Sequence, residues 1–305
     1  MILNILVPLD GSQLAEAALP GALWFSKLFG ARITLLHVIE HNAPASVHGE
    51  RHLTSETEAL DYLKSIAQHF PPGTQTIFHV HREEVSNVAR SIAMHAGELV
   101  QDLVVMCTHG KSGLRQLMVG NIAQKVISYG STPVLLVNPA HEEQGIFEQN
   151  VRLLVALDDD PEHSCGLELA GMVARRSGAN LLLLNVVPKL ETLHGQEAAA
   201  SKLLPAATMA LLEIEQEEAT TMLSKRAKPW ITKGVDVSWQ VRRGDPPEQI
   251  AKTASDTDAS LIVLGTHGKT GMGAFWAGSV APRMPALTDL PLLLVPTCWS
   301  YGEEE

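Results

Sequence analysis

The sequence predicts an α/β fold with two tandem domains, each a five-stranded, parallel, doubly wound sheet with flanking helices. Three observations predict it: a length of 305 residues, a set of apolar segments that occurs twice, and short apolar runs that alternate with amphipathic stretches. A chain of this length exceeds the usual size of one domain. We expect domains over residues 1–141 and 150–298, with the polar stretch NPAHEEQGIFEQN at their junction.

The repeat consists of four pairs of segments that occur in the same order and at similar spacing. The pairs are ILVPLD (5–10) with LLVALD (153–158), GARITLLHVI (30–39) with GANLLLLNVV (178–187), DLVVMCTHGKSG (102–113) with SLIVLGTHGKTG (260–271), and STPVLLVNP (131–139) with DLPLLLVP (289–296). Internal repetition on this scale indicates two copies of one fold.

Each copy alternates predicted strands with predicted helices. Runs such as 181–187 and 261–264 are continuously apolar, as expected of strands that are buried on both faces of a parallel sheet. The stretch GSQLAEAALPGALWFSKLFG predicts a helix, with Asp10 or Ser12 as its N-cap and Gly30 at its end. The order β-α-β-α-β-α-β-α-β predicts right-handed crossovers and a Rossmann-like topology. The helix around residues 203–228 is expected to be longer than its counterpart in the first copy.

Net charge limits the expected binding partners, and cysteine content indicates the expected cellular compartment. The net charge of −11 argues against a broad nucleic-acid interface, because affinity for the phosphate backbone needs clustered Lys and Arg. The three cysteines form no CxxC pair, which indicates a reducing compartment. The N-terminus lacks a basic leader, and no run approaches the roughly 18 apolar residues of a membrane span. We expect a cytoplasmic protein that binds neither nucleic acid nor membrane.

A glycine motif in the second copy indicates a nucleotide site. Gly265 ends an apolar run, Gly268 lies three residues later, and Gly278-Ser279 comes after nine more. Ligands of open parallel sheets bind beyond the carboxyl ends of the strands, where a glycine lets them lie close to the backbone. A helix that begins at Gly278-Ser279 would offer free N–H groups to phosphate. Asp158, after the first strand of this copy, could accept hydrogen bonds from ribose hydroxyls.

These residues resemble the nucleotide-binding motif of the universal stress protein family, in its tandem two-domain form. The match comprises Asp158, Val186, Gly265, Gly268, Gly278 and Ser279, and the resemblance covers nearly the whole chain. It implies a fold of the adenine-nucleotide alpha hydrolase (HUP) type and ATP or a related adenine nucleotide, with Mg2+, as ligand. In the family the valine flanks adenine, the aspartate meets ribose, and the glycines and serine hold phosphates.

The resemblance gives a full set of expected nucleotide-binding residues and an expected assembly. The set is Ala156, Leu157, Asp158, Val186, Leu264, Gly265, His267, Gly268, Gly278, Ser279 and Val280. Family members pair the final strand of the domain across a dimer interface, so the resemblance implies that the two copies face one another as a pseudo-dimer. We also expect a homodimer and an unidentified protein partner. The chain departs from the family at Ala156, where proline is usual, and at Pro282 and Pro285, which should kink or shorten the helix after Ser279.

The first copy keeps only part of the motif. Asp10, Val38, Gly110 and Gly120 persist, but Cys107 replaces the first glycine and Asn121 replaces the serine. Asp10, Val38, Gly110, Gly120 and Asn121 therefore form a weaker candidate site, and nucleotide binding by this copy stays open.

Histidines are concentrated in the first copy, where nine of the thirteen precede residue 110. His79 and His81 alternate on a predicted strand and so share a face, and His48 and His52 are four residues apart. Imidazole and thiolate are the usual ligands of zinc. The candidate zinc set is His48, His52, His79, His81 and Cys107, with His95 as a lesser option. The alternative is that these histidines are exposed or hydrogen-bonded to neighbours.

These patterns indicate three functions. The first is a nucleotide-binding stress-response protein that senses or stores ATP in its second copy. The second is a zinc-binding protein centred on the first copy, and the third is an interaction scaffold without nucleotide. The sequence contains no P-loop and no evident Ser-His-Asp arrangement, so we expect no dedicated enzyme activity and at most slow hydrolysis of ATP.

Overall fold

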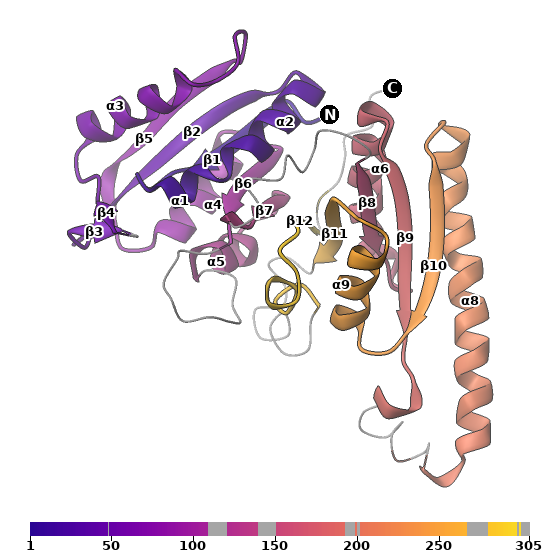
Figure 1. Cartoon of the computed structure of the whole chain (residues 1–305). Coiled ribbons are helices and arrows are strands. Elements are labelled where there is room, and N and C mark those ends of the chain that lie inside the picture. The colour runs from indigo at the N-terminus through magenta and orange to yellow at the C-terminus, as the bar shows by residue number, and fades with distance from the viewer. Residues whose placement is uncertain are drawn as a thin grey trace. The chain divides into compact units, whose positions relative to one another are not determined.

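The computed structural model describes residues 1–47, 49–108, 121–139, 151–192, 199, 202–266, 280–297 and 299. The chain forms two compact units (Figure 1). Unit 1 comprises Met1–Phe147 and Thr266–Glu305, and unit 2 comprises Glu148–Gly265. Both ends of the chain therefore contribute to unit 1.

The sheet of unit 1 contains five strands of the first copy and the last strand of the second. Its strands are β1 (Asn4–Pro8), β2 (Arg32–Glu40), β5 (Thr76–Val85), β6 (Leu103–Cys107), β7 (Val134–Val137) and β12 (Leu292–Pro296). Their order is β5-β2-β1-β6-β7-β12, and all neighbours are parallel except β12, which is antiparallel to β7. A separate hairpin pairs β3 (Ser46–Val47) with β4 (Glu50–Arg51).

The sheet of unit 2 contains the other four strands of the second copy, all parallel. These are β8 (Arg152–Ala156), β9 (Asn180–Val187), β10 (Val237–Arg243) and β11 (Leu261–Thr266), in the order β10-β9-β8-β11. The predicted fold class, α/β with mostly parallel sheets, is confirmed. The antiparallel pairing of β12 with β7 joins the final strands of the two copies, as the family resemblance implied.

The connecting helices alternate with the strands in both units. Unit 1 contains α1 (Gln13–Glu16), α2 (Leu19–Phe29), α3 (Glu56–Ala67), α4 (Val88–Glu98), α5 (Asn121–Tyr129) and the 3-10 turn η4 (Met284–Ala286). Unit 2 contains the 3-10 turns η2 (Pro161–Ser164) and η3 (Leu190–Thr192) and the helices α6 (Cys165–Ser177), α8 (Pro205–Thr232) and α9 (Pro246–Asp256).

The helix predicted over residues 11–30 is two helices, α1 and α2. Ser12 caps α1, and its side chain accepts a hydrogen bond from the N–H of Ala15. The chain breaks before Pro20, because proline has no N–H and its ring crowds the preceding turn. Gly30 ends α2 in the left-handed conformation, as predicted, with φ of 69°.

The helix predicted to begin at Gly278-Ser279 is absent from the described residues after it. From Val280 the chain forms a turn and then η4, and it enters β12 at Leu292. Pro282 and Pro285 interrupt this segment, and neither can donate a backbone hydrogen bond. The counterpart in the first copy, α5, contains no proline and is a nine-residue helix.

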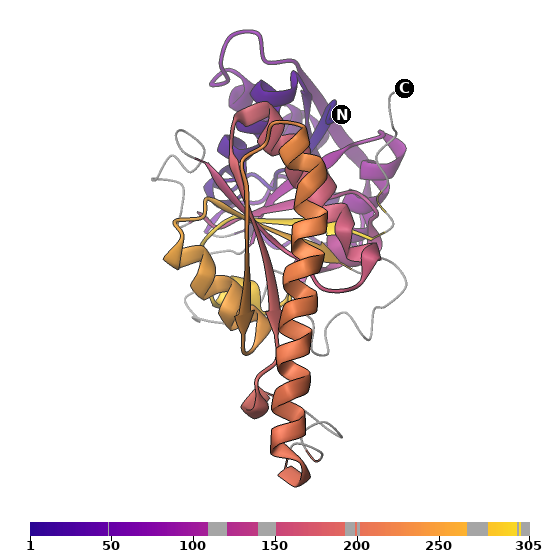
Figure 2. The same cartoon turned by 90° about the vertical axis from the view of Figure 1, so that its right-hand side faces the viewer.

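Helix α8 is longer than its counterpart α3, as predicted, with 28 residues against 12. It packs on β9 and β10, and its first turns extend past the ends of the strands (Figure 2). Its Trp230 is 3% exposed and lies against Gly171 of α6, where ring atoms fill the space that a Cβ would need. Among the described helices, none combines the length and apolar character that crossing a membrane requires.

The contact between Gly171 and Trp230 makes a testable prediction about stability. Gly171→Ala places a methyl group against a buried indole ring, so it should lower the free energy of unfolding by about 1–3 kcal/mol. Gly97→Ala in α4 is the control, because nothing lies within 4 Å of a Cβ there. It should be neutral or stabilise by up to about 1 kcal/mol. Urea denaturation followed by circular dichroism measures both, and equal stabilities would contradict the packing argument.

Candidate functional site

The carboxyl edge of the unit 2 sheet carries those motif residues that the structure describes. Ala156 pairs with Leu184 on one side and with Leu264 on the other. The residues just after these paired positions, Asp158 and Val186 among them, therefore reach the same edge of the sheet. Asp158 is exposed there and Val186 is half-buried. The predicted edge is thus formed by described residues of unit 2.

The Asp158 carboxylate already has partners within the chain. Its Oδ1 accepts a hydrogen bond from the Asp160 N–H at 3.1 Å, and its Oδ2 lies 2.5 Å from Nδ1 of His163. Partial burial raises the pKa of Asp158, but the hydrogen bond and charge of His163, with the Asp160 N–H, outweigh it and hold the pKa below its usual value. Asp158 is therefore ionised at neutral pH and serves as a hydrogen-bond acceptor.

Gly265 lies against the turn that carries His163. A Cβ at Gly265 would stand 2.8 Å from the His163 carbonyl oxygen and 3.1 Å from its Cα. The absence of a side chain at Gly265 thus lets the His163 backbone approach the end of β11. A glycine is required here by the 3-10 turn η2, whatever else the site binds.

The equivalent contact in the first copy, between the end of β6 and the segment after β1, contains a side chain. Cys107 occupies the end of β6 as Gly265 occupies that of β11, and its Sγ–H donates to the Ala15 carbonyl at 3.7 Å. Ala15 follows Asp10 by five residues, as His163 follows Asp158. Asp10 itself accepts from the N–H and the hydroxyl of Ser12, at 3.0 and 2.6 Å. The carboxylate of the first copy is thus held inside its own helix cap.

Several predicted nucleotide residues lie outside the part of the chain that the structure describes. These are Gly110, Gly120, His267, Gly268, Gly278 and Ser279, together with the side chain of Asn121, whose backbone begins α5. Of the remaining residues, Leu157, Leu264 and Val38 are buried, and Ala156 and Val280 are half-buried.

A pair of equivalent residues outside the predicted set holds the loop after the first strand in each copy. In unit 1, Nδ1 of His37 lies 2.8 Å from the Leu9 carbonyl oxygen, and its Nε2 lies 3.3 Å from that of Leu53. In unit 2, Asn185 stands at the equivalent position and donates to the Leu157 carbonyl at 2.9 Å. The repeat alignment places these two residues together, and it was the signal that could have found them.

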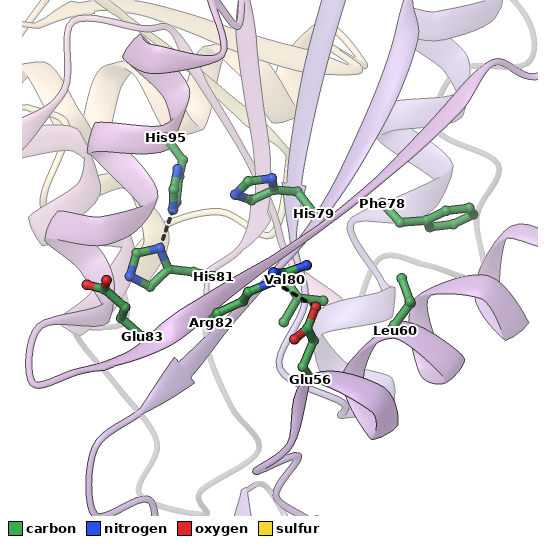
Figure 3. Close-up of a pocket in the computed structure, with 9 residues that line it drawn as sticks. All are labelled: Glu56, Leu60, Phe78, His79, Val80, His81, Arg82, Glu83 and His95. Atoms are coloured by element: carbon green, nitrogen blue, oxygen red, sulfur yellow. Dashed lines mark hydrogen bonds and ion pairs between the residues drawn. The ribbon is translucent and has the colours of Figure 1, made fainter.

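A cluster of three imidazoles lies between β5 and α4 in unit 1 (Figure 3). Nε2 of His95 is 2.9 Å from Nδ1 of His81, and the His79 ring meets the His95 ring edge-on, with 4.7 Å between centroids. Nδ1 of His95 also lies 3.3 Å from Glu98. We call His79, His81 and His95 the histidine cluster. His79 and His81 share a strand face as predicted. Their partner is His95, which the sequence analysis gave only as a lesser option.

The histidine cluster borders a cavity of about 550 Å³ that wraps the edge strand β5. The opposite side of this strand carries Phe78 and an ion pair of 2.8 Å between Arg82 and Glu56 of α3 (Figure 3). Burial lowers the pKa of both His79 and His95, and the neighbouring imidazoles lower it further, while Glu98 opposes the shift. The surroundings of His79 and His95 therefore favour their neutral imidazoles.

The predicted zinc set of His48, His52, His79, His81 and Cys107 is not assembled. His79 and His81 lie on β5 and Cys107 on β6, three strands away, which corresponds to about 14 Å across a sheet. His52 is buried near His37, and His48 lies outside the described residues. Among the residues that the structure describes, no group of three or more His, Cys, Asp or Glu side chains is arranged to hold a metal ion.

Comparison with known proteins identifies the family from which this architecture comes. The model of the family described as "Universal stress protein family" matches the chain twice, over residues 1–138 and 150–296. The chain belongs to the universal stress protein family. The two matches fall on the two copies of the repeat, so this universal stress protein is of the tandem type.

Relatives of this universal stress protein support the assignment along its whole length. A universal stress protein of Mycolicibacterium smegmatis is 24% identical over 96% of both chains. One from Methanocaldococcus jannaschii is 30% identical over 46% of this chain and 84% of its own. The crystal structure of a universal stress protein from Archaeoglobus fulgidus matches with a TM-score of 0.63 and 17% identity, over 96% of this chain and 98% of that one. The structural likeness shows the fold.

The turn over Gly265 makes a second prediction about this universal stress protein. Gly265→Ala places a Cβ against the His163 backbone, which cannot rotate away, and should lower the free energy of unfolding by about 1–3 kcal/mol. Cys107→Ala is the matched control, because the first copy already accommodates a side chain there. It should cost about 1 kcal/mol or less. Thermal unfolding compares the two, and an equal loss would show that the turn gives way.

The histidine cluster makes a prediction about pH. The pKa values of His79 and His95 lie below the unfolded value near 6.5, so the unfolded chain binds more protons as pH falls through 6.5. The free energy of unfolding should hold its full value above that pH and decrease below it. Each unit of pKa difference is worth about 1.4 kcal/mol. His95→Gln should reduce this loss between pH 7.5 and 5, as measured by urea denaturation.

The control for the pH experiment is His69→Gln, which removes an exposed histidine of the same unit. Because this variant keeps the histidine cluster, its free energy of unfolding should show the same decrease below pH 6.5 as the wild type. A His95→Gln profile that also coincides with the wild-type profile would contradict the assignment of a neutral, buried imidazole to the histidine cluster.

Proposed function

We propose that this protein binds ATP or a related adenine nucleotide, with Mg2+, in its second copy, and that nucleotide occupancy changes its contacts with protein partners in a stress response. The observation that supports this is the exposed, ionised Asp158 at the same sheet edge as half-buried Val186. A carboxylate suits ribose hydroxyls as an acceptor, and an apolar side chain beside it suits the face of adenine.

Phosphate binding in this proposal depends on backbone amides. The motif supplies Gly268, Gly278 and Ser279, and the family resemblance assigns the phosphates to them. Because only the 3-10 turn η4 comes after them in the described residues, we expect loop amides and the Ser279 hydroxyl, rather than the dipole of a long helix, to hold the phosphates. Ala156, Leu157, Leu264, Gly265, His267 and Val280 complete the proposed lining.

The proposal includes several expectations from the sequence. These are domain limits of 1–141 and 150–298, a homodimer in the cytoplasm, and at most slow hydrolysis of ATP, because the motif contains no dedicated catalytic group. The first copy is expected to bind more weakly or not at all, since Cys107 and the cap of Asp10 alter its edge. A scaffold without nucleotide is the alternative function, and a binding titration separates the two.

The proposal predicts one ATP bound per chain. Isothermal titration calorimetry of the nucleotide-stripped protein with Mg-ATP should give a stoichiometry near one. Gly278→Trp should abolish the binding by filling the phosphate site, whereas the matched variant Gly120→Trp in the first copy should leave it unchanged. A stoichiometry of two would contradict the assignment to one copy, and no heat with Mg-ATP would leave the scaffold as the function.

A further inference from the structure

The carboxylate that would receive the ribose is already engaged by a side chain of the same unit. Nδ1 of His163 is 2.5 Å from Oδ2 of Asp158, and the backbone N–H of Asp160 donates to Oδ1. The His163 side chain is 15% exposed, while that of Asp158 is 58% exposed. The aspartate thus faces solvent, and its internal partner stands behind it within the turn.

Two features hold His163 in this place, and a third is its effect on Asp158. The turn η2 is closed by a hydrogen bond of 3.2 Å from the His163 N–H to the Asp160 carbonyl. The absence of a side chain at Gly265 lets the His163 backbone approach the end of β11. The charge of the imidazole is one cause of the lowered pKa of Asp158. The contact is therefore built by the fold and is more than a surface encounter of two mobile side chains.

The first copy lacks this arrangement. Ala15 stands at the position equivalent to His163, and Ser12 serves Asp10 as a local cap. An imidazole aimed at the aspartate is thus specific to the copy that carries the intact glycine motif.

We infer that His163 is a positioning residue that competes with the ribose hydroxyls for the Asp158 carboxylate. This inference rests on the proposed nucleotide site. A ribose hydroxyl donates to the same oxygen that the imidazole N–H occupies, so the ribose binds only by displacing or sharing that hydrogen bond. Hydrogen bonds to charged groups are among the stronger ones, and their loss opposes binding. Ligands without ribose hydroxyls do not compete and are not opposed.

The test compares two ligands on four proteins by calorimetry. The ligands are Mg-ATP and its 2′,3′-dideoxy analogue, and the proteins are wild type, His163→Ala, His163→Phe and His163→Asn. Alanine and phenylalanine remove the donor, and phenylalanine preserves ring volume should the smaller residue destabilise the turn. Asparagine retains an N–H near the Nδ1 position. The donor-free variants should bind ATP about three- to tenfold more tightly, with no change for the dideoxy analogue, and His163→Asn should remain close to wild type.

The outcomes separate this inference from the proposed function. If the wild type binds ATP and the donor-free variants bind it equally or more weakly, the role of His163 is wrong and the nucleotide site stands. An equal gain for ATP and the dideoxy analogue also overturns the inference, because the effect would then not involve ribose. If wild type and all variants bind neither ligand, both proposals fail. ATP binding that becomes measurable only in the donor-free variants would support both.

Discussion

The burial of the central strands on both faces is the constraint on which the rest of each unit depends. The side chains of Ile5–Val7 in β1 and Leu153–Val155 in β8 are 0% exposed, since helices cover both faces of the parallel sheets. A strand buried in this way cannot shift its register without moving apolar groups into water. Because β1 and β8 are fixed, the loops that come after them, with Asp10 and Asp158, are fixed at the carboxyl edge. The positions of these two carboxylates therefore depend on the buried strands before them.

The two copies use one backbone plan and differ in how its edge is filled. In both, the turn after the first strand crosses the end of the fourth strand of the copy. In the first copy, the Cys107 thiol at the strand end donates to the Ala15 carbonyl of this turn. In the second copy there is no room for a Cβ at Gly265, and the His163 side chain contacts Asp158. At this shared contact the copies thus differ by two substitutions, Cys107 for Gly265 and Ala15 for His163.

Features that depend on periodicity could be predicted from the sequence, whereas contacts with partners far along the chain could not. Apolar runs and the repeat were sufficient for the fold, for the long α8 and for the shared face of His79 and His81. The break before Pro20 was missed, although proline disfavours a continuous helix and the sequence therefore contained its signal. The partners of Gly265 and His79 could not be predicted from the sequence. They depend on how the turn η2 packs against the end of β11 and how α4 packs against β5. The zinc prediction was wrong for the same reason. It was based on residue type, and the sequence did not show that β5 and β6 are three strands apart in the sheet.

The antiparallel pairing of β12 with β7 has a consequence for how the chain reaches its native state. Leu293 pairs with Leu135, so the sheet of unit 1 is completed by residues that leave the ribosome about 160 positions after their partners. Until then β7 has an unpaired, wholly apolar edge of the kind that promotes association between chains. Closing such a long loop is also slow relative to local pairing. The nascent protein therefore passes through a stage in which a nearly complete unit 1 needs protection from its neighbours.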